Sequence, residues 1–216
     1  MEKFEHPFTA VVAGPTGSGK TVLVRKMLAN HNLVINKLPI DRPPRITWCY
    51  GIATTLNKQP IPNCIVSYSE GMNEKDIFEA KPDVLVIDDL MAEKSSDTSL
   101  ANLFTRGSHH MNMTVIFIVQ NFFSKGNQMR TISLNAKYII LLKNPRDKSQ
   151  VYSLGRQLFP NKSNYFREAY EDATKRKHGY LLIDLSQNCD DNHRLRTDIF
   201  NIHPKLGYTP SIYIST

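Results

Sequence analysis

The chain has 216 residues, 41% hydrophobic and 22% charged, with a formal net charge of +7. That length supports one sizeable core, so we predict a single domain over residues 1–216. No apolar run approaches the ~20 residues of a membrane-spanning helix. The first six residues are polar, so we expect no secretory signal peptide and no membrane requirement. The positive charge favours a polyanionic partner such as DNA or RNA.

Short apolar runs and helical stretches alternate along the chain. In chain order, the patterns predict strand, helix, strand, strand, helix, strand, helix, strand, strand, helix, helix, strand and strand. Their expected bounds are 8–13, 19–30, 45–50, 63–68, 74–80, 84–87, 98–108, 114–119, 138–142, 148–158, 165–174, 180–185 and 194–200. This alternation predicts an α/β fold, with a mostly parallel central sheet flanked by helices. The last two strands, separated by a polar loop, are expected to form an antiparallel hairpin.

A phosphate-binding loop follows the first predicted strand. It fits the pattern GxxxxGK[ST] with Gly14, Pro15, Thr16, Gly17, Ser18, Gly19, Lys20 and Thr21. The glycines let successive backbone amides face one point, where the start of the next helix adds to an anion site. We expect Lys20 to reach the β- and γ-phosphates and the Thr21 hydroxyl to bind Mg²⁺. The loop therefore predicts a P-loop NTPase.

Two carboxylates end the apolar strand predicted at 84–87. Asp88 is placed to hold Mg²⁺, directly or through water. Asp89 is placed to accept a proton from the attacking water. Asp83, at the other end of the strand, is expected to lie on the surface.

The strand predicted at 114–119 ends in a polar pair, Gln120 and Asn121. Some P-loop ATPases have an additional strand between the P-loop strand and the acidic strand. The tip of that strand carries a polar sensor, which binds the γ-phosphate or the attacking water. We assign this sensor to Gln120, with Asn121 as the second choice.

A γ-phosphate site in a ring ATPase often receives a further positive charge from the neighbouring subunit. Arg106, just before the sensor strand, is the leading candidate, and Arg146 and Arg156 are rivals. A basic run at 175–178 is interpreted as a solvated helix end or as a DNA-backbone contact.

Several motifs occur in a specific order along the chain. After the GPTGSGKT loop and the strand ending in DD come the Arg106 turn, VIFIVQN, TISLNAKYIILLKNPRDKSQV, LGRQLFP and HGYLLIDL. Together they resemble the FtsK/HerA-type DNA-packaging ATPases of double-stranded DNA viruses. The likeness is in particular to those of the Polinton, adintovirus and virophage group, which are poxvirus-like in this component. It runs from about residue 8 to about residue 200.

The resemblance implies an ATP- and Mg²⁺-dependent motor that moves double-stranded DNA into a preformed capsid. It also implies a pentameric or hexameric ring with the nucleotide between subunits, and a capsid or portal-vertex protein as a partner. The expected location is the nucleus or cytoplasmic virus factory of an infected cell, or the virion itself. By this likeness Lys20 and Thr21 carry the phosphate and Mg²⁺ roles, and Asp88 carries the metal role. Asp89 is then the base, Gln120 the sensor and Arg106 the arginine that acts in trans. Asp89 departs from the more usual Glu.

Three other functions fit parts of the sequence. A DNA helicase or another nucleic-acid translocase is the nearest in mechanism. A nucleotide or nucleoside kinase shares the phosphate loop, and Arg146, Arg156 and Arg167 could serve as its lid. The paired acids and Gln120 favour water as the acceptor over a kinase substrate. A GTP switch expects an NKxD guanine reader, and the NKLP and NKSN segments lack its Asp.

Overall fold

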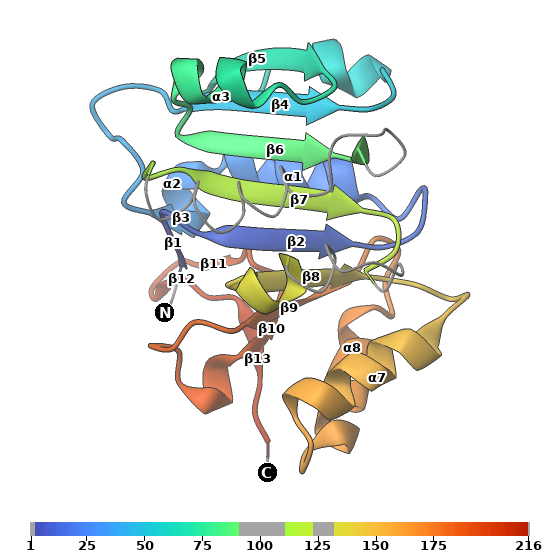
Figure 1. Ribbon diagram of the computed structural model, residues 1–216. Helices are drawn as coiled ribbons and strands as arrows, with labels where there is room; N and C mark the ends of the chain where they lie inside the picture. Colours follow the sequence, from blue (N-terminus) through green and yellow to red (C-terminus); the bar gives the residue numbers. More distant parts are fainter. Residues whose placement is uncertain (1–2, 91–110, 123–131, 216) are drawn as a thin grey trace.

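A nine-stranded sheet organises the molecule (Figure 1). The computed structural model describes residues 3–90, 111–122 and 132–215. The strand order is β13-β10-β9-β8-β2-β7-β6-β4-β5. The strands from β8 to β5 are mutually parallel. Their bounds are β2 Thr9–Ala13, β4 Arg45–Tyr50, β5 Ile65–Glu70, β6 Val84–Asp88, β7 Thr114–Val119 and β8 Tyr138–Leu142.

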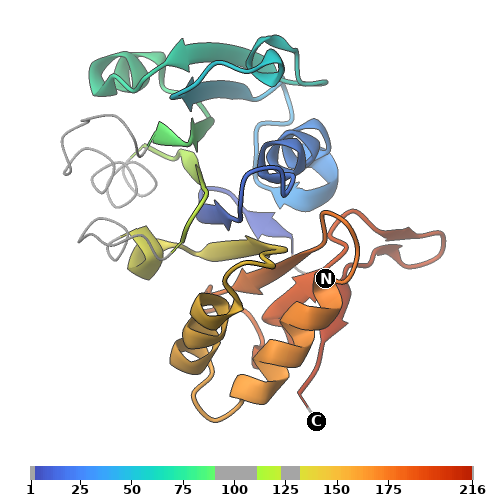
Figure 2. The same ribbon diagram turned by 90° about the vertical axis from the view of Figure 1, so that its right-hand side faces the viewer.

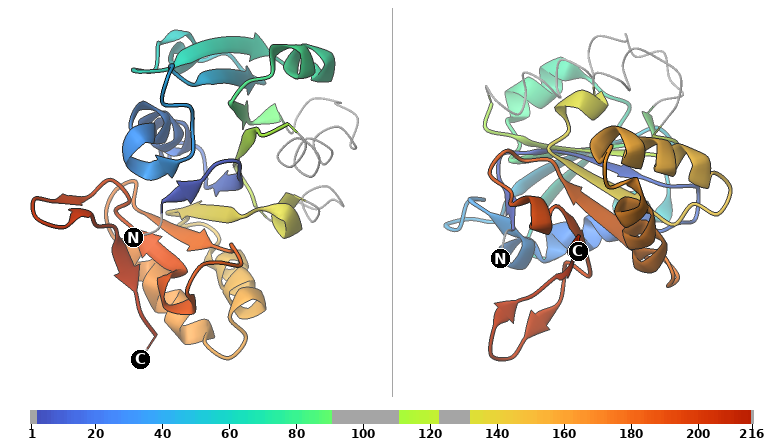
Figure 3. Two further views of the ribbon diagram at one scale, coloured as in Figure 1. Left: turned by 90° about the vertical axis from the view of Figure 1, so that its left-hand side faces the viewer. Right: turned by 90° about the horizontal axis from the view of Figure 1, so that it is seen from below.

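The remaining three strands of the sheet run antiparallel to their neighbours. They are β9 Tyr180–Asp184, β10 Leu195–Thr197 and β13 Ser211–Tyr213. The predicted C-terminal hairpin is therefore present as β9 and β10, and β13 extends it. Two short pairs lie outside the sheet: β1 Phe4–Glu5 with β3 Ile35–Asn36, and β11 Ile202–His203 with β12 Gly207–Tyr208. The β11–β12 pair extends away from the main sheet (Figure 3).

Strand β7 lies between β2 and β6, which confirms the predicted additional strand. Val12 of β2 pairs with Ile118 of β7, and Ile118 in turn pairs with Asp88 of β6. Because these strands are parallel and in register, their carboxyl ends meet at one edge of the sheet. The segments that follow β2, β6 and β7 are therefore brought together there.

Both faces of the sheet are buried, so its central strands are continuous apolar runs. Side chains alternate between the faces along each strand. On one face, Ala10 and Val12 pack in the core that includes Leu23, Met27 and Leu28 of α1. On the other face, strand side chains pack with residues of α3, α7 and α8. Figure 2, which looks onto the strand ends, shows α1 and α3 on opposite sides of the sheet.

Among the described residues the helices are α1 Lys20–Ala29, α2 His31–Val34, α3 Glu74–Ala80, α7 Lys148–Leu158 and α8 Ser163–Ala173, with 3-10 turns at Thr55–Lys58 and Asp191–His193. Asp147 caps α7, since its carboxylate accepts from the amide of Gln150. Gly155 lets α7 approach α8, because a Cβ there would lie 2.2 Å from the ring of Phe166. In the described part of the chain, no helix has the length and apolar character to cross a bilayer.

Most predicted bounds agree with the structure to within two residues. One prediction is not tested by the described residues, and one differs in a way that affects the site. The helix predicted at 98–108 lies outside the described residues. The strand predicted at 194–200 is too long, because β10 ends at Thr197 and Asp198 adopts a left-handed backbone with φ of 50°. The chain then turns away from the sheet, so Phe200 lies beside α1 with Lys26 over its ring.

The prediction that Asp83 lies on the surface is wrong. Its exposed fraction is 9%. Both carboxylate oxygens accept from Arg42, at 2.6 and 2.8 Å, and one also accepts from the amide of Arg45 at 2.7 Å. The acid is retained at this buried position because its charge is paired and its oxygens are hydrogen-bonded.

Candidate nucleotide-hydrolysis site

The predicted phosphate loop lies at the carboxyl edge of the sheet, between β2 and α1. The amide of Gly14 donates to the carbonyl of Val119 at the end of β7, at 3.2 Å. Gly19 precedes α1 with φ of 99°, a left-handed conformation that favours glycine. The loop therefore begins against the additional strand and ends at a helix N-terminus, where anions are stabilised.

Lys20 is 9% exposed and lies within the loop. Its Nζ donates to the carbonyls of Gly14 and Pro15, at 2.6 and 3.1 Å. Burial lowers the pKa of Lys20, although Asp89 and Asp88 act in the opposite direction. The ammonium group is thus held inside the phosphate loop beside two carboxylates.

Thr21 and Asp88 bring two oxygen ligands together. The hydroxyl of Thr21 donates to Asp88 Oδ2 at 3.3 Å. Burial raises the pKa of Asp88 above its usual range, and the Thr21 hydrogen bond offsets this only partly. A hydroxyl and a carboxylate are the hard oxygen donors that Mg²⁺ takes in nucleotide sites. In the same loop the Ser18 hydroxyl is buried and has no hydrogen-bond partner, so it is available to a ligand. Together, the Thr21 and Ser18 hydroxyls and the Asp88 carboxylate fit a magnesium–phosphate group.

Asp89 and Gln120 face each other across the ends of β6 and β7. Gln120 Nε2 donates to Asp89 Oδ2 at 2.5 Å, and Gln120 Oε1 accepts from the Thr16 hydroxyl at 3.2 Å. The backbone of Asp89 is left-handed, with φ of 54°, and its amide donates to the carbonyl of Ile118. The predicted base, the predicted sensor and the phosphate loop are thus joined by two hydrogen bonds.

The arginine candidates lie in different settings. Arg106 is outside the described residues. Arg146 is exposed in the loop that follows β8. Arg156 is exposed on α7, and its guanidinium donates to Ser153 Oγ at 3.0 Å. The second-choice sensor, Asn121, is exposed just after β7.

One residue beside the site was not singled out by the sequence analysis. His178 Nδ1 donates to the carbonyl of Ser18 at 2.9 Å, although the two residues are 160 positions apart. A Cβ on Gly19 would lie 3.0 Å from this imidazole. All four residues of the basic run at 175–178 are exposed, in agreement with the interpretation as a solvated segment. His178 in addition supports the phosphate loop, a long-range contact for which the sequence carries no local signal.

The sheet order, the phosphate loop after β2 and the acidic end of β6 define a P-loop NTPase fold. The structure resembles that of the genome packaging NTPase B204 from Sulfolobus turreted icosahedral virus 2 in complex with AMP. The TM-score is 0.50 at 17% identity, over 83% of this chain and 93% of that chain. The ATP-gammaS complex of B204 gives a TM-score of 0.51 at 16% identity, over 82% and 92%.

A second resemblance is to the flagellar accessory protein FlaH from Methanocaldococcus jannaschii. Its TM-score is 0.51 at 13% identity, over 98% of this chain and 92% of that chain. No protein-family profile and no curated protein matches the sequence. At these identities the solved structures establish the shared fold.

Proposed function

We propose that this chain is an ATP-hydrolysing motor that moves double-stranded viral DNA into a preformed capsid. The observation that carries the proposal is the convergence of Lys20, Asp88 and Asp89 at the carboxyl edge of the parallel sheet, where the segments after β2 and β6 meet around β7. The fold likeness to a viral genome packaging NTPase is compatible with this motor.

The hydrolytic step follows from the positions of the side chains. Lys20 and the loop amides bind the phosphates, and Thr21 and Asp88 hold Mg²⁺. When bound there, Mg²⁺ would supply positive charge to the triphosphate. Asp89 accepts a proton from the attacking water, and Gln120 orients that water or the γ-phosphate. Gln120 already contacts Asp89 and Thr16, so it can respond to both the base and the phosphate loop.

Two observations support duplex DNA as the substrate that the motor moves: the net charge of the chain and the fold likeness. The net charge of +7 favours a polyanion. Exposed basic residues, including Lys175, Arg176 and Lys177, offer backbone contacts on the surface beside the phosphate loop. A ring of such subunits, docked on a capsid or portal-vertex protein, would present several copies of these charges to DNA.

The test is ATP hydrolysis with and without duplex DNA at low salt. We expect DNA to raise the turnover number of the parent, and added salt to reduce the effect steeply, because phosphate contacts release counterions. Lys20→Ala and Asp88→Ala should lower turnover by at least about 100-fold, since each removes a charge that acts on the triphosphate. The motor proposal would be overturned if no DNA changed the ATPase rate of the parent protein.

Controls separate the neighbouring functions. Glu79, exposed on α3, provides a matched carboxylate control as Glu79→Gln, which should hydrolyse ATP like the parent. A forked duplex should remain unopened, because a packaging motor moves along duplex DNA. Strand separation at the rate of ATP turnover would instead indicate a helicase.

A further inference from the structure

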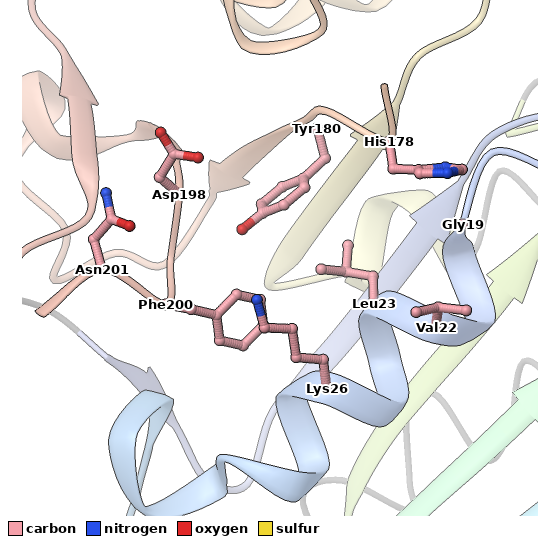
Figure 4. Close-up of a pocket in the computed structure, with 9 residues that line it drawn as sticks. All are labelled: Gly19, Val22, Leu23, Lys26, His178, Tyr180, Asp198, Phe200 and Asn201. Atoms are coloured by element: carbon pink, nitrogen blue, oxygen red, sulfur yellow. The ribbon is translucent and has the colours of Figure 1, made fainter. Parts of the chain in front are cut away.

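A cavity of about 300 Å³ opens directly beside the phosphate loop. Figure 4 shows the residues that surround it, which come from the start of α1, from the beginning of β9 and the residues just before it, and from the segment that follows β10. The lining residues are Gly19, Val22, Leu23, Lys26, His178, Tyr180, Asp198, Phe200 and Asn201. Gly19 belongs to both the phosphate loop and the cavity wall, so the two sites are continuous.

The body of the cavity is apolar. Val22 projects from α1 with an exposed fraction of 58%, although it lies beside the buried Leu23. Tyr180 is 8% exposed, and its hydroxyl accepts from the amide of Ile199 at 3.0 Å, so its ring is held in place. Phe200 completes the wall, with Lys26 Nζ 4.2 Å from its ring centroid. An apolar slot of this size is typical of a small-molecule site.

The end of the cavity away from the loop is polar. Asn201 is exposed, while its backbone is fixed on both sides: its amide donates to Asp198 and its carbonyl accepts from Thr209, each at 3.0 Å. Asp198 Oδ2 accepts from Ser211 Oγ at 3.4 Å, and Oδ1 lies 3.8 Å from Arg176. A carboxylate and an amide are thus presented on a fixed backbone at one end of an apolar slot.

The stretch of α1 that lines the cavity is about as long as a nucleoside. From Gly19 to Lys26, α1 rises about 10 Å, at 1.5 Å per residue. A nucleotide whose phosphates occupy the loop would therefore extend its sugar and base along this side of α1. A base with an exocyclic amine suits the polar end, because a carboxylate only accepts hydrogen bonds. An asparagine amide can donate to a ring nitrogen and accept from that amine, which is the pattern of adenine.

We infer that this cavity is the adenine site of the nucleotide, with Val22, Tyr180 and Phe200 as its apolar walls and Asp198 and Asn201 as its base readers. The inference rests on the proposed function, because it takes the phosphates to lie in the loop. His178 joins the two parts of the site, since it lines the cavity and binds the loop carbonyl of Ser18.

The test compares two ligands on the full chain by calorimetry in the presence of Mg²⁺. ATP reports on the loop and the cavity together, whereas inorganic tripolyphosphate reports on the loop alone. Phe200→Ala and Asn201→Ala should each weaken ATP binding about tenfold, as expected when a base loses an aromatic or polar contact. Tripolyphosphate binding should stay within about twofold of the parent.

Ile202 provides the matched control, because it is the next residue, is 61% exposed and does not line the cavity. Ile202→Ala should bind both ligands like the parent. GTP places a carbonyl where adenine carries its amine, so the parent should bind GTP about tenfold more weakly than ATP. Because Asn201 is exposed, Asn201→Ala should fold like the parent. This variant should show a smaller difference between its affinities for ATP and GTP.

The adenine site is overturned if the parent binds tripolyphosphate as tightly as ATP. It is also overturned if GTP matches ATP, or if both cavity variants bind ATP like the parent. A different result would disprove the motor alone: ATP binding would depend on the cavity residues, but DNA would not change the rate of ATP hydrolysis. The two proposals can therefore fail separately.

Discussion

Asp89 is the residue on which the proposed chemistry depends most directly. Its carboxylate accepts from Gln120 Nε2 at 2.5 Å, and its left-handed backbone places it at the end of β6. The carboxylate lies beside Lys20, whose ammonium group it stabilises. An aspartate at this position is one methylene shorter than a glutamate. The hydrogen bond from Gln120 holds this shorter side chain at the edge of the phosphate loop.

Asp89→Asn should lower the turnover number by about 10²–10⁴-fold, the range for loss of a general base. The amide keeps an oxygen that can accept from Gln120, so the affinity for ATP should change little. Steady-state kinetics and ATP calorimetry measure the two effects. Asp89→Glu is the control, because it restores a basic oxygen and should recover part of the rate. Full activity in Asp89→Asn would remove this residue from the mechanism.

At the scale of elements, a buried ion pair fastens the antiparallel end of the sheet. Arg196 of β10 donates to Asp184 of β9, and their side chains are 3% and 1% exposed. Asp184 also accepts from the amide of Ser186 at 2.9 Å. Tyr180, at the other end of β9, lines the cavity beside α1. The pair therefore helps to position one wall of the inferred adenine site.

Asp184→Asn should destabilise the fold by about 3–5 kcal/mol, because it leaves the Arg196 charge buried without its partner. Urea unfolding at neutral pH measures the change. The pair of Asp191 and Arg194 provides the control, since the Asp191 side chain is 87% exposed and that of Arg194 is 22% exposed. Asp191→Asn should have little effect. Equal losses of unfolding free energy in Asp184→Asn and Asp191→Asn would contradict the larger role assigned to the buried ion pair.

Asp83 predicts a pH dependence at the opposite end of β6. Burial would raise the pKa of Asp83, but the hydrogen bonds from Arg42 and from the amide of Arg45 outweigh it, and the pKa is lowered from 3.8. A carboxylate with a lowered folded-state pKa stabilises the fold fully above its unfolded pKa. That contribution is lost as the pH falls through 3.8 towards the folded value.

The free energy of unfolding should fall less between pH 7 and about pH 3.5 in Asp83→Asn than in the parent. Urea unfolding at pH 7 and at about pH 3.5 gives the comparison, because the pH window lies just below the ordinary aspartate pKa. The variant should also be less stable at pH 7, by about 2 kcal/mol, as a charged buried hydrogen bond is weakened. Parallel pH profiles for parent and variant would refute the linkage.

At the scale of the whole molecule, the proposed motor requires more than one chain. The phosphate loop and its acids lie at the edge of the sheet, and Arg146 lies exposed in the loop after β8, also at that edge. A ring would let a neighbouring subunit contribute an arginine to each site. We propose Arg106 for this role, and Arg146 and Arg156 as the alternatives.

Arg106→Ala should lower ATP turnover by about 10³-fold, the lower range for an arginine finger. Mixing it with the inactive Lys20→Ala chain should restore part of the activity, since some interfaces then combine an intact loop with an intact arginine. ATP hydrolysis of the mixture and its mass with a nonhydrolysable analogue are the measurements. Arg146→Ala and Arg156→Ala serve as parallel variants. A mixture as inactive as its components would rule out action in trans.

Much of this architecture could be predicted from local patterns. Strands β4, β7 and β8 and helices α3 and α7 have the bounds expected from their apolar periodicity. The phosphate loop was recognisable because its glycines, Lys20 and Thr21 are contiguous. Asp88, Asp89 and Gln120 were recognisable because polar residues that end buried strands must meet at one edge of a parallel sheet.

Other features depend on contacts between distant segments. Asp83 looked like a surface residue because its partner, Arg42, lies 41 positions away. His178 is part of an exposed basic run, and only the tertiary structure shows that this segment, just before β9, lies against Ser18. Phe200 looked like the end of a strand, yet the left-handed turn at Asp198 directs it to α1. The sequence by itself determined the class of fold and predicted a phosphate site, because the alternation of strands and helices encodes the first and one contiguous loop motif the second. Only the tertiary structure decided which buried charges are paired and where a base could bind, because those depend on the order of strands in the sheet.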